Sequence, residues 1–401
     1  MNFEVYKSVY SVSVMRVKTC ALCGKESLFV SRTLSVCRDC ILSDFKNAYS
    51  YILDAHKQAR SPLGLPTVPP RSDSKVKCNL CANQCSIPIG QKSYCGLYEN
   101  HDNMLKSIVN SRKALMYWYL DSHVTNCTAA WFCPAGTGIG YPKFAYKDGP
   151  EIGYYNLAVF FYGCNFDCLF CQNSSHKFLS EGRVVTINDF VDIFRDYKNI
   201  SCICYFGGSP EPQLPFTINA SKAVLETYSD RIVRICAEWN GCGNSSLVKK
   251  LGELALESGG VLKFDLKTYS ENLSIALSGV SNRQAYKNFE MLYNEFYNER
   301  PEIPLITAST LLVPGYVTPD EVEQITSFIA SLNPEIPYTL LIFHPDYLMT
   351  DLPVTPYEDV VESFLVAKKY LKNVYVGNLH LIGFLSFKSF LRSIRNNPNN
   401  E

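Results

Sequence analysis

The stretch Gly163-Cys-Asn-Phe-Asp-Cys-Leu-Phe-Cys-Gln-Asn173 decides how the rest of the chain is interpreted. An apolar run over residues 157–162 precedes it and predicts a buried strand. The loop carries three cysteines in the pattern Cys-x3-Cys-x2-Cys, namely Cys164, Cys168 and Cys171. Three thiolates are one short of the four that normally hold a [4Fe–4S] cluster, so one iron would stay open to a ligand. A zinc knot of the Cys3His type, completed by His176, is the alternative.

Beyond residue 156, apolar runs alternate with helical stretches up to the C-terminus. This alternation implies a parallel sheet with right-handed crossovers, so we expect an α/β fold with a partial (β/α)6 TIM-type barrel. In such barrels the chemistry gathers at the carboxyl ends of the strands. The expected strands are 157–162, 202–207, 232–238, 261–267, 306–313, 338–344 and 374–377. The expected helices are 187–198, 217–229, 245–258, 282–297, 319–332 and 356–371.

The turn after the second expected strand reads Tyr205-Phe-Gly-Gly-Ser-Pro-Glu-Pro212. With the cysteine loop, it resembles the radical S-adenosylmethionine (SAM) superfamily, in which a Gly-Gly-Glu-Pro-like turn contacts the amino group of SAM. The glycines would let the backbone approach the ligand closely. Ser209 stands where the family has an acid, and Glu211 follows two residues later. The resemblance therefore assigns cofactor binding to Gly207, Gly208, Ser209 and Glu211.

Two further strand ends resemble enzymes that activate glycyl radical enzymes. Glu238-Trp-Asn-Gly241 is similar to their Thr-Asn-Gly stretch, which would turn Glu238 and Asn240 toward the cofactor; a plain turn is the alternative for Asn240. In Phe264-Asp-Leu-Lys267, Asp265 and Lys267 share one side of a strand. The same Asp-x-Lys occurs in the pyruvate formate-lyase activating enzyme family near SAM and substrate, so these two residues are expected to be catalytic.

The fifth expected strand ends in Leu312-Val-Pro-Gly315, again as in that family. The activating enzyme has an Arg in this strand that touches SAM, and here Ser309 and Thr310 stand nearest to its place. His344 closes the sixth expected strand. It is either a catalytic group that faces the substrate or a satisfied core residue.

The stretches 341–356 and 374–378, and the segment from Cys78 to Gly96, resemble the radical SAM member of the AmmeMemoRadiSam system. The resemblance covers about 76–380 in chain order. It implies a [4Fe–4S] cluster that binds SAM and cleaves it, after one-electron reduction, to methionine and a 5′-deoxyadenosyl radical. That radical would abstract hydrogen from a substrate. A low-potential electron donor of the ferredoxin or flavodoxin type is the expected partner.

Two other groups of cysteines have metal-ligand spacing. The first has zinc-ribbon spacing and would close a tetrahedral structural site, for which zinc is favoured over a rubredoxin-like iron. It comprises Cys20, Cys23, Cys37 and Cys40. The second suits zinc or an auxiliary [4Fe–4S] cluster, with a slight preference for zinc or another structural metal. It comprises Cys78, Cys81, Cys85 and Cys95.

Five segments are expected along the chain: a zinc-ribbon-like domain with a helix over 42–60 (1–60), a proline-rich linker (61–75), a cysteine-rich and aromatic accessory domain (76–150), the radical SAM barrel (151–380), and a C-terminal helix and tail (381–401). The accessory domain contains His123, Cys127 and Cys133. These three would line a substrate pocket or bind a metal, and a packed loop with buried thiols is the alternative.

Composition excludes several classes of protein. Lys and Arg together number 38, as do Asp and Glu, so the net charge is zero and argues against a nucleic-acid partner. No apolar run is long enough for a membrane span, and residues 1–18 lack a signal-peptide pattern. Seventeen cysteines without an export signal indicate metal binding in a reducing compartment, the cytoplasm.

The sequence leaves the substrate open among three hypotheses. The first is activation of a glycyl radical enzyme or another modification of a protein or peptide, based on Asp265, Lys267 and the Val-Pro-Gly turn. The second is radical modification of a small molecule or lipid, with the aromatic segment 115–146 as its pocket. The third is a non-catalytic, metal-stabilised RNA-binding protein, which the neutral charge disfavours.

Overall fold

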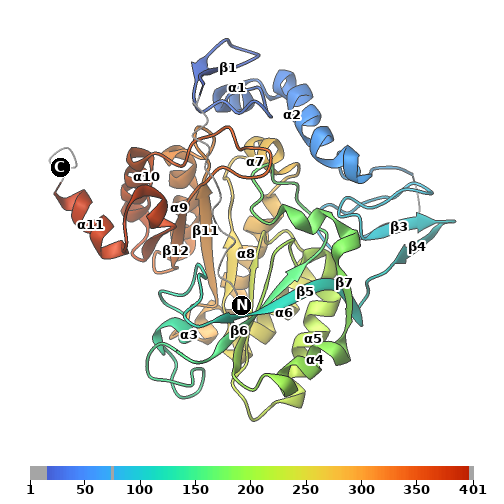
Figure 1. Cartoon of the computed structure of the whole chain (residues 1–401), viewed down its shortest axis with the longest axis vertical. Coiled ribbons are helices and arrows are strands. Elements are labelled where there is room, and N and C mark those ends of the chain that lie inside the picture. The colour runs from blue at the N-terminus through green and yellow to red at the C-terminus, as the bar shows by residue number, and fades with distance from the viewer. Residues whose placement is uncertain (1–15, 74–75, 397–401) are drawn as a thin grey trace, which may run out of the picture.

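The computed structural model describes residues 16–73 and 76–396 of the chain (Figure 1). Its centre is a nine-stranded sheet in the order β13-β12-β11-β10-β9-β8-β6-β5-β7. The seven strands from β6 and β8 to β13 pair in parallel, which confirms the expected partial barrel. The strands are β5 (Lys113–Ser122), β6 (Tyr155–Phe161), β7 (Arg183–Thr186), β8 (Ile200–Phe206), β9 (Arg234–Trp239), β10 (Leu262–Asp265), β11 (Ile306–Leu312), β12 (Tyr338–Ile342) and β13 (Val374–Gly377).

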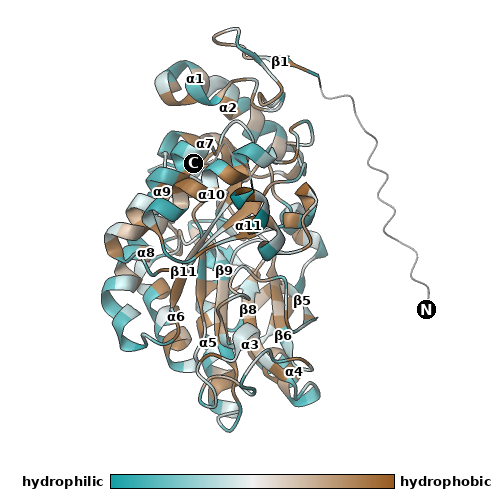
Figure 2. Ribbon diagram, turned by 90° about the vertical axis from the view of Figure 1, so that its left-hand side faces the viewer, coloured by the Kyte–Doolittle hydropathy of each residue, from teal (hydrophilic) through white to brown (hydrophobic). Residues whose placement is uncertain are grey.

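Helices cover the outer face of this curved sheet, and hydrophobic strands lie beneath them (Figure 2). The six expected helices are present within a few residues, and α11 supplies the expected C-terminal helix. The short helix α7 was not expected, because its eight residues interrupt what looked like one loop. The helices are α4 (Ile187–Asp196), α5 (Leu214–Thr227), α6 (Ser245–Ser258), α7 (Glu271–Ser278), α8 (Arg283–Phe296), α9 (Pro319–Leu332), α10 (Tyr357–Tyr370) and α11 (Phe387–Arg395). None of the described helices is both long and apolar enough to cross a membrane.

Helix α4 shows how local sequence sets an element. Thr186 and Asp189 form a reciprocal capping box, in which each side chain accepts a hydrogen bond from the other residue's backbone N–H. Phe190, Ile193 and Phe194 then fall on one face at helical spacing and are buried. The cap fixes where the helix begins, and the apolar face fixes which side packs on the sheet.

Strand β5 corrects the expected boundary at residue 150. It pairs antiparallel with β6 along seven residues and with β7 along four, so it belongs to the same sheet as the barrel. The boundary would separate two hydrogen-bonded neighbours. The sequence did not predict that β5 belongs to this sheet, because β5 is not a uniformly apolar run. It is aromatic and partly exposed, with Tyr117 and Tyr119 open to solvent.

The N-terminal region lies on the α7 side of the barrel (Figure 1). It contains β1 (Lys18–Thr19), β2 (Glu26–Ser27), α1 (Arg38–Ser43) and α2 (Phe45–Arg60); the expected helix over 42–60 is thus broken at Asp44. The hydroxyl of Tyr316, after β11, accepts from the backbone N–H of Ser31 at 3.0 Å and donates to the carbonyl of Val36 at 2.9 Å. The first fifteen residues of the expected ribbon and the tail after residue 396 lie outside the described residues.

Beyond α2 the chain runs through a 3-10 turn (Ser61–Leu63) to the second group of cysteines and then to the small hairpin β3 (Tyr98–His101) and β4 (Met104–Ser107). Several hydrogen bonds attach the cysteine segment to the barrel. The backbone N–H of Ala82 donates to the carbonyl of Cys242 at 2.9 Å, and the Asn83 amide donates to the carbonyl of Asn165 at 2.7 Å. These contacts place the segment directly against the loop that holds Cys164.

Candidate functional site

A pocket opens at the carboxyl ends of the parallel strands, where the barrel topology predicts chemistry. The three cysteines of the Cys-x3-Cys-x2-Cys loop line it together with seven of the nine other residues expected at the site. These seven are Gly207, Gly208, Ser209, Glu238, Asn240, Asp265 and Lys267. Residues more than one hundred positions apart in sequence therefore meet in one pocket.

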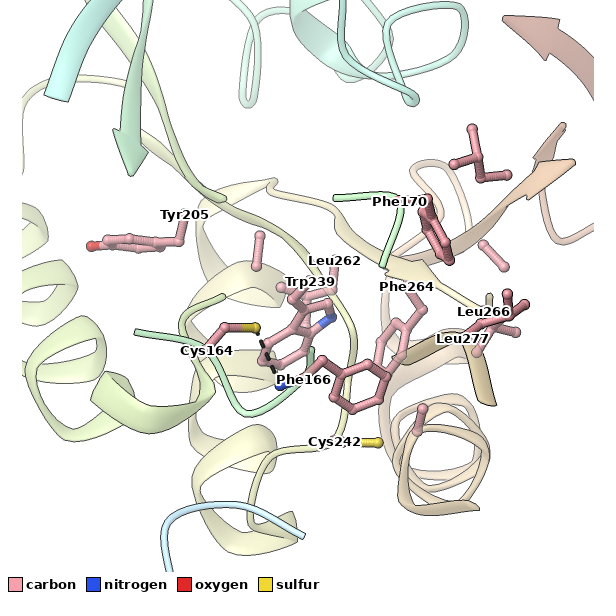
Figure 3. Packing of buried hydrophobic residues seen from close by; sticks show 14 of the residues in the cluster. Cys164, Phe166, Phe170, Tyr205, Trp239, Cys242, Leu262, Phe264, Leu266 and Leu277 are labelled. Atoms are coloured by element: carbon pink, nitrogen blue, oxygen red, sulfur yellow. Dashed lines mark hydrogen bonds between the residues drawn. The ribbon is translucent and has the colours of Figure 1, made fainter. Parts of the chain in front are cut away.

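The cysteine loop is held by its own backbone and by α7. The N–H groups of Asp167 and Leu169 donate to the carbonyls of Ser278 and Leu277 at 2.8 and 2.9 Å. The N–H of Phe166 donates to Cys164 Sγ at 3.3 Å, beside the buried rings of Trp239 and Phe264 (Figure 3). Such N–H···S contacts favour the thiolate form that binds iron.

The spacing of the thiols argues against a single metal ion at this loop. Among the described residues, no three ligand atoms drawn from the loop cysteines and His176 lie within 4.8 Å of one another. A single zinc ion would need them that close, so the Cys3His alternative is not formed. His176 is buried, and its Nδ1 has no hydrogen-bond partner in the part of the chain that the structure describes. Burial raises the pKa of the Cys171 thiol to about 12, so its deprotonation depends on a bound cation.

The glycine pair after β8 brings the backbone close to the cysteine loop. Both glycines have φ of +61°, a conformation that other residues adopt only with strain. A Cβ atom on Gly208 would lie 2.1 Å from the carbonyl oxygen of Phe161, and one on Gly207 would lie 2.1 Å from the ring of Phe160. Only glycine fits at either position, so the turn can form one wall of the pocket without side chains.

An amide network joins three strand ends. Asn240 Nδ2 donates to Ser209 Oγ at 3.0 Å and to Asn165 Oδ1 at 2.8 Å. Asn165 Nδ2 donates back to Asn240 Oδ1 at 3.2 Å. Asn240 thus does more than shape a turn, because it couples the cysteine loop to the glycine turn. Asn165 was not expected as a site residue, although its place between Cys164 and Cys168 was a usable signal.

Two expected residues lie outside the pocket lining. Glu211 is fully buried, and its Oε1 accepts from the N–H of Gly241 at 2.8 Å. Burial raises its pKa to about 7. The carboxylate therefore supports the turn after β9, and the expected contact with SAM stays a prediction. His344 is half-buried at the end of β12, 3.9 Å from Asp346, and its expected catalytic role also stays a prediction.

Asp265 and Lys267 form an ion pair at the end of β10, as their shared side of the strand predicts. Burial opposes the charge of Lys267, but Asp265 and the thiols of Cys168 and Cys171 outweigh it and raise its pKa. The second carboxylate oxygen of Asp265 has no partner among the described residues. The pair therefore offers a pocket ligand one fixed cation and one free acceptor beside the cysteine loop.

The ribbon cysteines form a different kind of site. Their sulfurs all lie within 4.8 Å of one another, with 3.7 Å between Cys20 and Cys40 and 3.8 Å between Cys23 and Cys37. Four thiolates at about 2.3 Å from one tetrahedral ion are separated by about 3.8 Å, so this group fits a single metal ion. The group of Cys78, Cys81, Cys85 and Cys95 is buried, but its four sulfurs do not come this close together.

The buried carboxylate of Asp167, within the cysteine loop, connects helix α2 to the site. His56 Nδ1 lies 2.7 Å from Asp167 Oδ2, and Lys177 and Arg60 lie 2.5 and 3.4 Å from Oδ1. The Arg60 guanidinium also stacks 3.7 Å from the ring centre of Tyr94. Burial opposes the charge of Asp167, yet the hydrogen bond from His56 and the two cations lower its pKa. This network was not predicted, because no local pattern pairs residues 56 and 167.

Comparison with known proteins agrees with this geometry. Residues 158–329 match the model of the radical SAM superfamily. The chain therefore contains a radical SAM domain. The matched region of this radical SAM enzyme contains the cysteine loop, the glycine turn and the Asp265–Lys267 pair. SAM and a [4Fe–4S] cluster are therefore its cofactors. The pocket fits them, because it offers three thiols, a wall of two glycines without side chains and an oxygen of Asp265 that has no partner among the described residues.

Two curated proteins of Methanocaldococcus jannaschii are similar to this radical SAM enzyme. "Uncharacterized protein MJ0808" is 25% identical over 320 residues, which cover 77% of this chain and 82% of that protein. "Putative glycyl-radical enzyme activating enzyme MJ1632" is 26% identical over 224 residues, which cover 54% of this chain and 79% of that protein.

Solved structures resemble it more distantly. SuiB of Streptococcus suis, bound to its precursor peptide SuiA, aligns with a TM-score of 0.40 and 16% identity over 55% of this chain and 48% of SuiB. A domain of a pyruvate-formate lyase-activating enzyme from Bacteroides vulgatus aligns with a TM-score of 0.34 and 18% identity, over 44% of this chain and 98% of the domain. The matched region thus spans about half the length of SuiB, and the assignment rests on the family model.

The Asp167 network predicts a large loss of stability on charge removal. In an Asp167→Asn variant, Arg60 and Lys177 would stay buried without their shared carboxylate, which costs about 3 kcal/mol or more. We expect a lower thermal unfolding midpoint, measured by circular dichroism, and less iron per chain. The control is Asp192→Asn, which removes an exposed carboxylate paired with Arg195 on α4. Equal midpoints in the two variants would contradict the proposed anchoring.

Proposed function

We propose that this radical SAM enzyme binds its [4Fe–4S] cluster through Cys164, Cys168 and Cys171 and takes a hydrogen atom from a protein or peptide. The observation that carries the proposal is the meeting of these thiols with the glycine turn and the Asp265–Lys267 pair in one pocket. When bound, the cluster and SAM supply the reductive cleavage that yields the 5′-deoxyadenosyl radical. Activation of a glycyl radical enzyme is the leading form of the reaction.

The residues of the chain would position the reactants. Gly207, Gly208 and Ser209 line the side on which the amino group of SAM is expected, with Asn240 holding Ser209 in place. Asp265 and Lys267 would orient the ligand groups nearest the open iron, one as acceptor and one as donor. Phe166, Phe170 and Leu341 line the same pocket and would exclude water from the reacting atoms.

A polypeptide substrate is favoured over a small molecule or lipid for two reasons. The relative whose name describes a putative activating enzyme of glycyl radical enzymes is 26% identical over 224 residues, and the Asp-x-Lys of that class is present here. The aromatic segment 115–146, expected to form a small-molecule pocket, does not gather at one place in the structure. Trp131 stacks on Tyr375 of β13 and donates to Thr339 near the start of β12, away from the cysteine loop.

The exposed part of that segment fits a polypeptide instead. Tyr117 and Tyr119 of β5 remain open to solvent, and Tyr119 contacts Phe206, which lines the pocket. An exposed aromatic wall that continues into the pocket suits a chain lying across it better than an enclosed small molecule.

Two further assignments complete the proposal. The ribbon group Cys20, Cys23, Cys37 and Cys40 would hold zinc and serve structure, because four protein ligands leave no open position. The reducing equivalent would come from a ferredoxin or flavodoxin-type donor in the cytoplasm, since reduction of SAM needs a potential near the low end of the iron–sulfur range.

The activity is tested with anaerobically reconstituted, dithionite-reduced protein. We expect wild type to release 5′-deoxyadenosine from SAM, measured by liquid chromatography, and Cys168→Ala to lose at least a hundredfold of that rate. Cys242→Ala is the matched control, because it removes a buried thiol that does not line the pocket. Undiminished cleavage in Cys168→Ala would overturn the assignment of the cluster ligands.

The substrate class is tested by isotope transfer. Reduced enzyme and SAM are incubated with an extract of deuterium-labelled cells that has been divided by filtration into macromolecules and small molecules. We expect deuterium in 5′-deoxyadenosine with the macromolecular fraction, and loss of the signal after that fraction is treated with protease. Transfer from the small-molecule fraction alone, undiminished by protease treatment of that fraction, would contradict a protein or peptide substrate.

The ribbon metal is tested by counting metals in Cys23→Ser. We expect this variant to lose about one zinc per chain while its iron and acid-labile sulfide stay unchanged, measured by plasma mass spectrometry and a sulfide assay. Loss of one iron in place of zinc would show a rubredoxin-type site instead.

A further inference from the structure

Strand β5 presents an open sheet edge beside the pocket of the cysteine loop. On one side, β6 pairs with it from Met116 to Ser122. On the other side, β7 pairs only with the first four residues, Lys113 to Met116. Residues 117–122 therefore have a neighbouring strand on one side only, and the proposed function makes no use of their backbone.

The backbone bonds at the two ends of this stretch show which groups face the open side. The carbonyl of Leu115 and the N–H of His123 both bond toward β6, at 3.0 Å to Tyr162 and 3.0 Å to Tyr154. Successive residues of a strand direct these groups to opposite sides. The even-numbered residues of the stretch therefore direct their N–H and C=O away from β6, and these groups form no hydrogen bond within residues 16–73 and 76–396. They are Trp118, Leu120 and Ser122.

This edge lacks the features that normally prevent pairing with another chain. Native edges are kept short, or carry lysine, proline or a bulge. The two outermost strands of the sheet, β7 and β13, have four residues each. By contrast, β5 keeps an unbroken register along seven residues of β6, and residues 117–122 contain neither lysine nor proline. A regular edge of this kind suits the addition of another strand.

The exposed rings on β5 lead from this edge into the pocket. Tyr117 and Tyr119 are 38% and 43% exposed and share one face of the strand. The ring of Tyr119 lies 6.2 Å from that of Phe206, which lines the pocket. Tyr117 stacks on Phe160, whose ring lies against Gly207 of the pocket wall. A chain along the edge would thus pass over two aromatic rings before it reaches the pocket.

The upper end of the open edge lies at the level of the cysteine loop. Arg183, the first residue of β7, is the partner of Met116, so β7 occupies the place of an added strand from there on. On its other side Met116 is the partner of Phe161, three residues before Cys164. A chain that follows the edge upward must therefore leave it where the cysteine loop begins.

We propose that an extended segment of the polypeptide substrate adds to β5 as a strand along residues 117–122, and that the residues next to this segment enter the pocket. The inference rests on the proposed function, because it describes how a protein or peptide is held for hydrogen transfer. The outward backbone groups of β5 would supply affinity that does not depend on sequence. Tyr117 and Tyr119 would select the side chains that face them.

Proline at an outward N–H tests the strand addition. Leu120→Pro removes a donor that β6 does not use, and proline is tolerated at such edge positions. The matched control Leu120→Ala keeps the N–H. With the full chain, reconstituted anaerobically, we measure deuterium transfer into 5′-deoxyadenosine from the macromolecular fraction of labelled cells, and total 5′-deoxyadenosine beside it. We expect Leu120→Pro to lose about tenfold of the protease-sensitive transfer relative to Leu120→Ala, because a hydrogen bond is lost and the ring blocks a pairing strand.

The possible outcomes separate this inference from the proposed function. Equal transfer in Leu120→Pro and Leu120→Ala would overturn the strand addition alone, whereas wild type without protease-sensitive transfer would overturn the proposed function and the strand addition with it. Higher transfer in Leu120→Pro would show that a segment of the enzyme itself pairs with the edge. A wild-type dimer that becomes monomeric in Leu120→Pro, measured by light scattering, would show that a second copy does. Either result would also overturn the proposal.

A second pair of variants covers the case in which Leu120→Pro does not fold, as judged by circular dichroism. Ser122→Pro and its control Ser122→Ala change an exposed residue at the end of the strand, whose N–H also faces outward. The same loss of transfer is expected for Ser122→Pro relative to Ser122→Ala, and equal transfer in these two variants would overturn the proposal.

Discussion

The arrangement of this enzyme depends on one buried carboxylate. Asp167 stands inside the Cys-x3-Cys-x2-Cys loop and is held by His56 and Arg60 of α2 and by Lys177 after the loop. A charge can be buried at this depth only if opposite charges and hydrogen bonds surround it. The loop therefore takes its shape only when α2 is docked. The N-terminal region is part of the scaffold of the site rather than an appended module.

Other contacts support the same docking. The hydroxyl of Tyr316, which follows the Val-Pro-Gly turn, is bonded on both sides to the ribbon backbone. Asp351 forms an ion pair with Lys18 and accepts from the N–H of Arg32 at 2.9 Å. Two loops of the barrel thus hold the ribbon in place. Because the ribbon is small and has little hydrophobic core of its own, a structural metal would stabilise it further.

The cysteines divide according to what surrounds them. The ribbon sulfurs are spaced for one ion, and the loop cysteines line a pocket beside a free acceptor and a fixed cation. Five further thiols line a second cavity, in which Lys263 Nζ lies 3.3 Å from Cys204 Sγ. Glu238 lies between the two ends of the barrel. It lines the pocket of the cysteine loop, and it is the register partner of Lys263 on the next strand. The interior of the sheet is therefore a polar column rather than an aliphatic core.

Local sequence determined the elements and the cysteine loop of this protein. Apolar runs and amphipathic stretches record burial directly, so the seven parallel strands and six of the helices were predictable, and the spacing of Cys164, Cys168 and Cys171 indicated an open metal site. Tertiary structure alone decided that Asp167 meets His56, that Asn165 meets Asn240, that Glu211 supports a turn and that five dispersed thiols share one cavity. These pairings depend on sheet register and on a long antiparallel strand, β5, and such contacts between distant residues leave no periodic signal in the sequence.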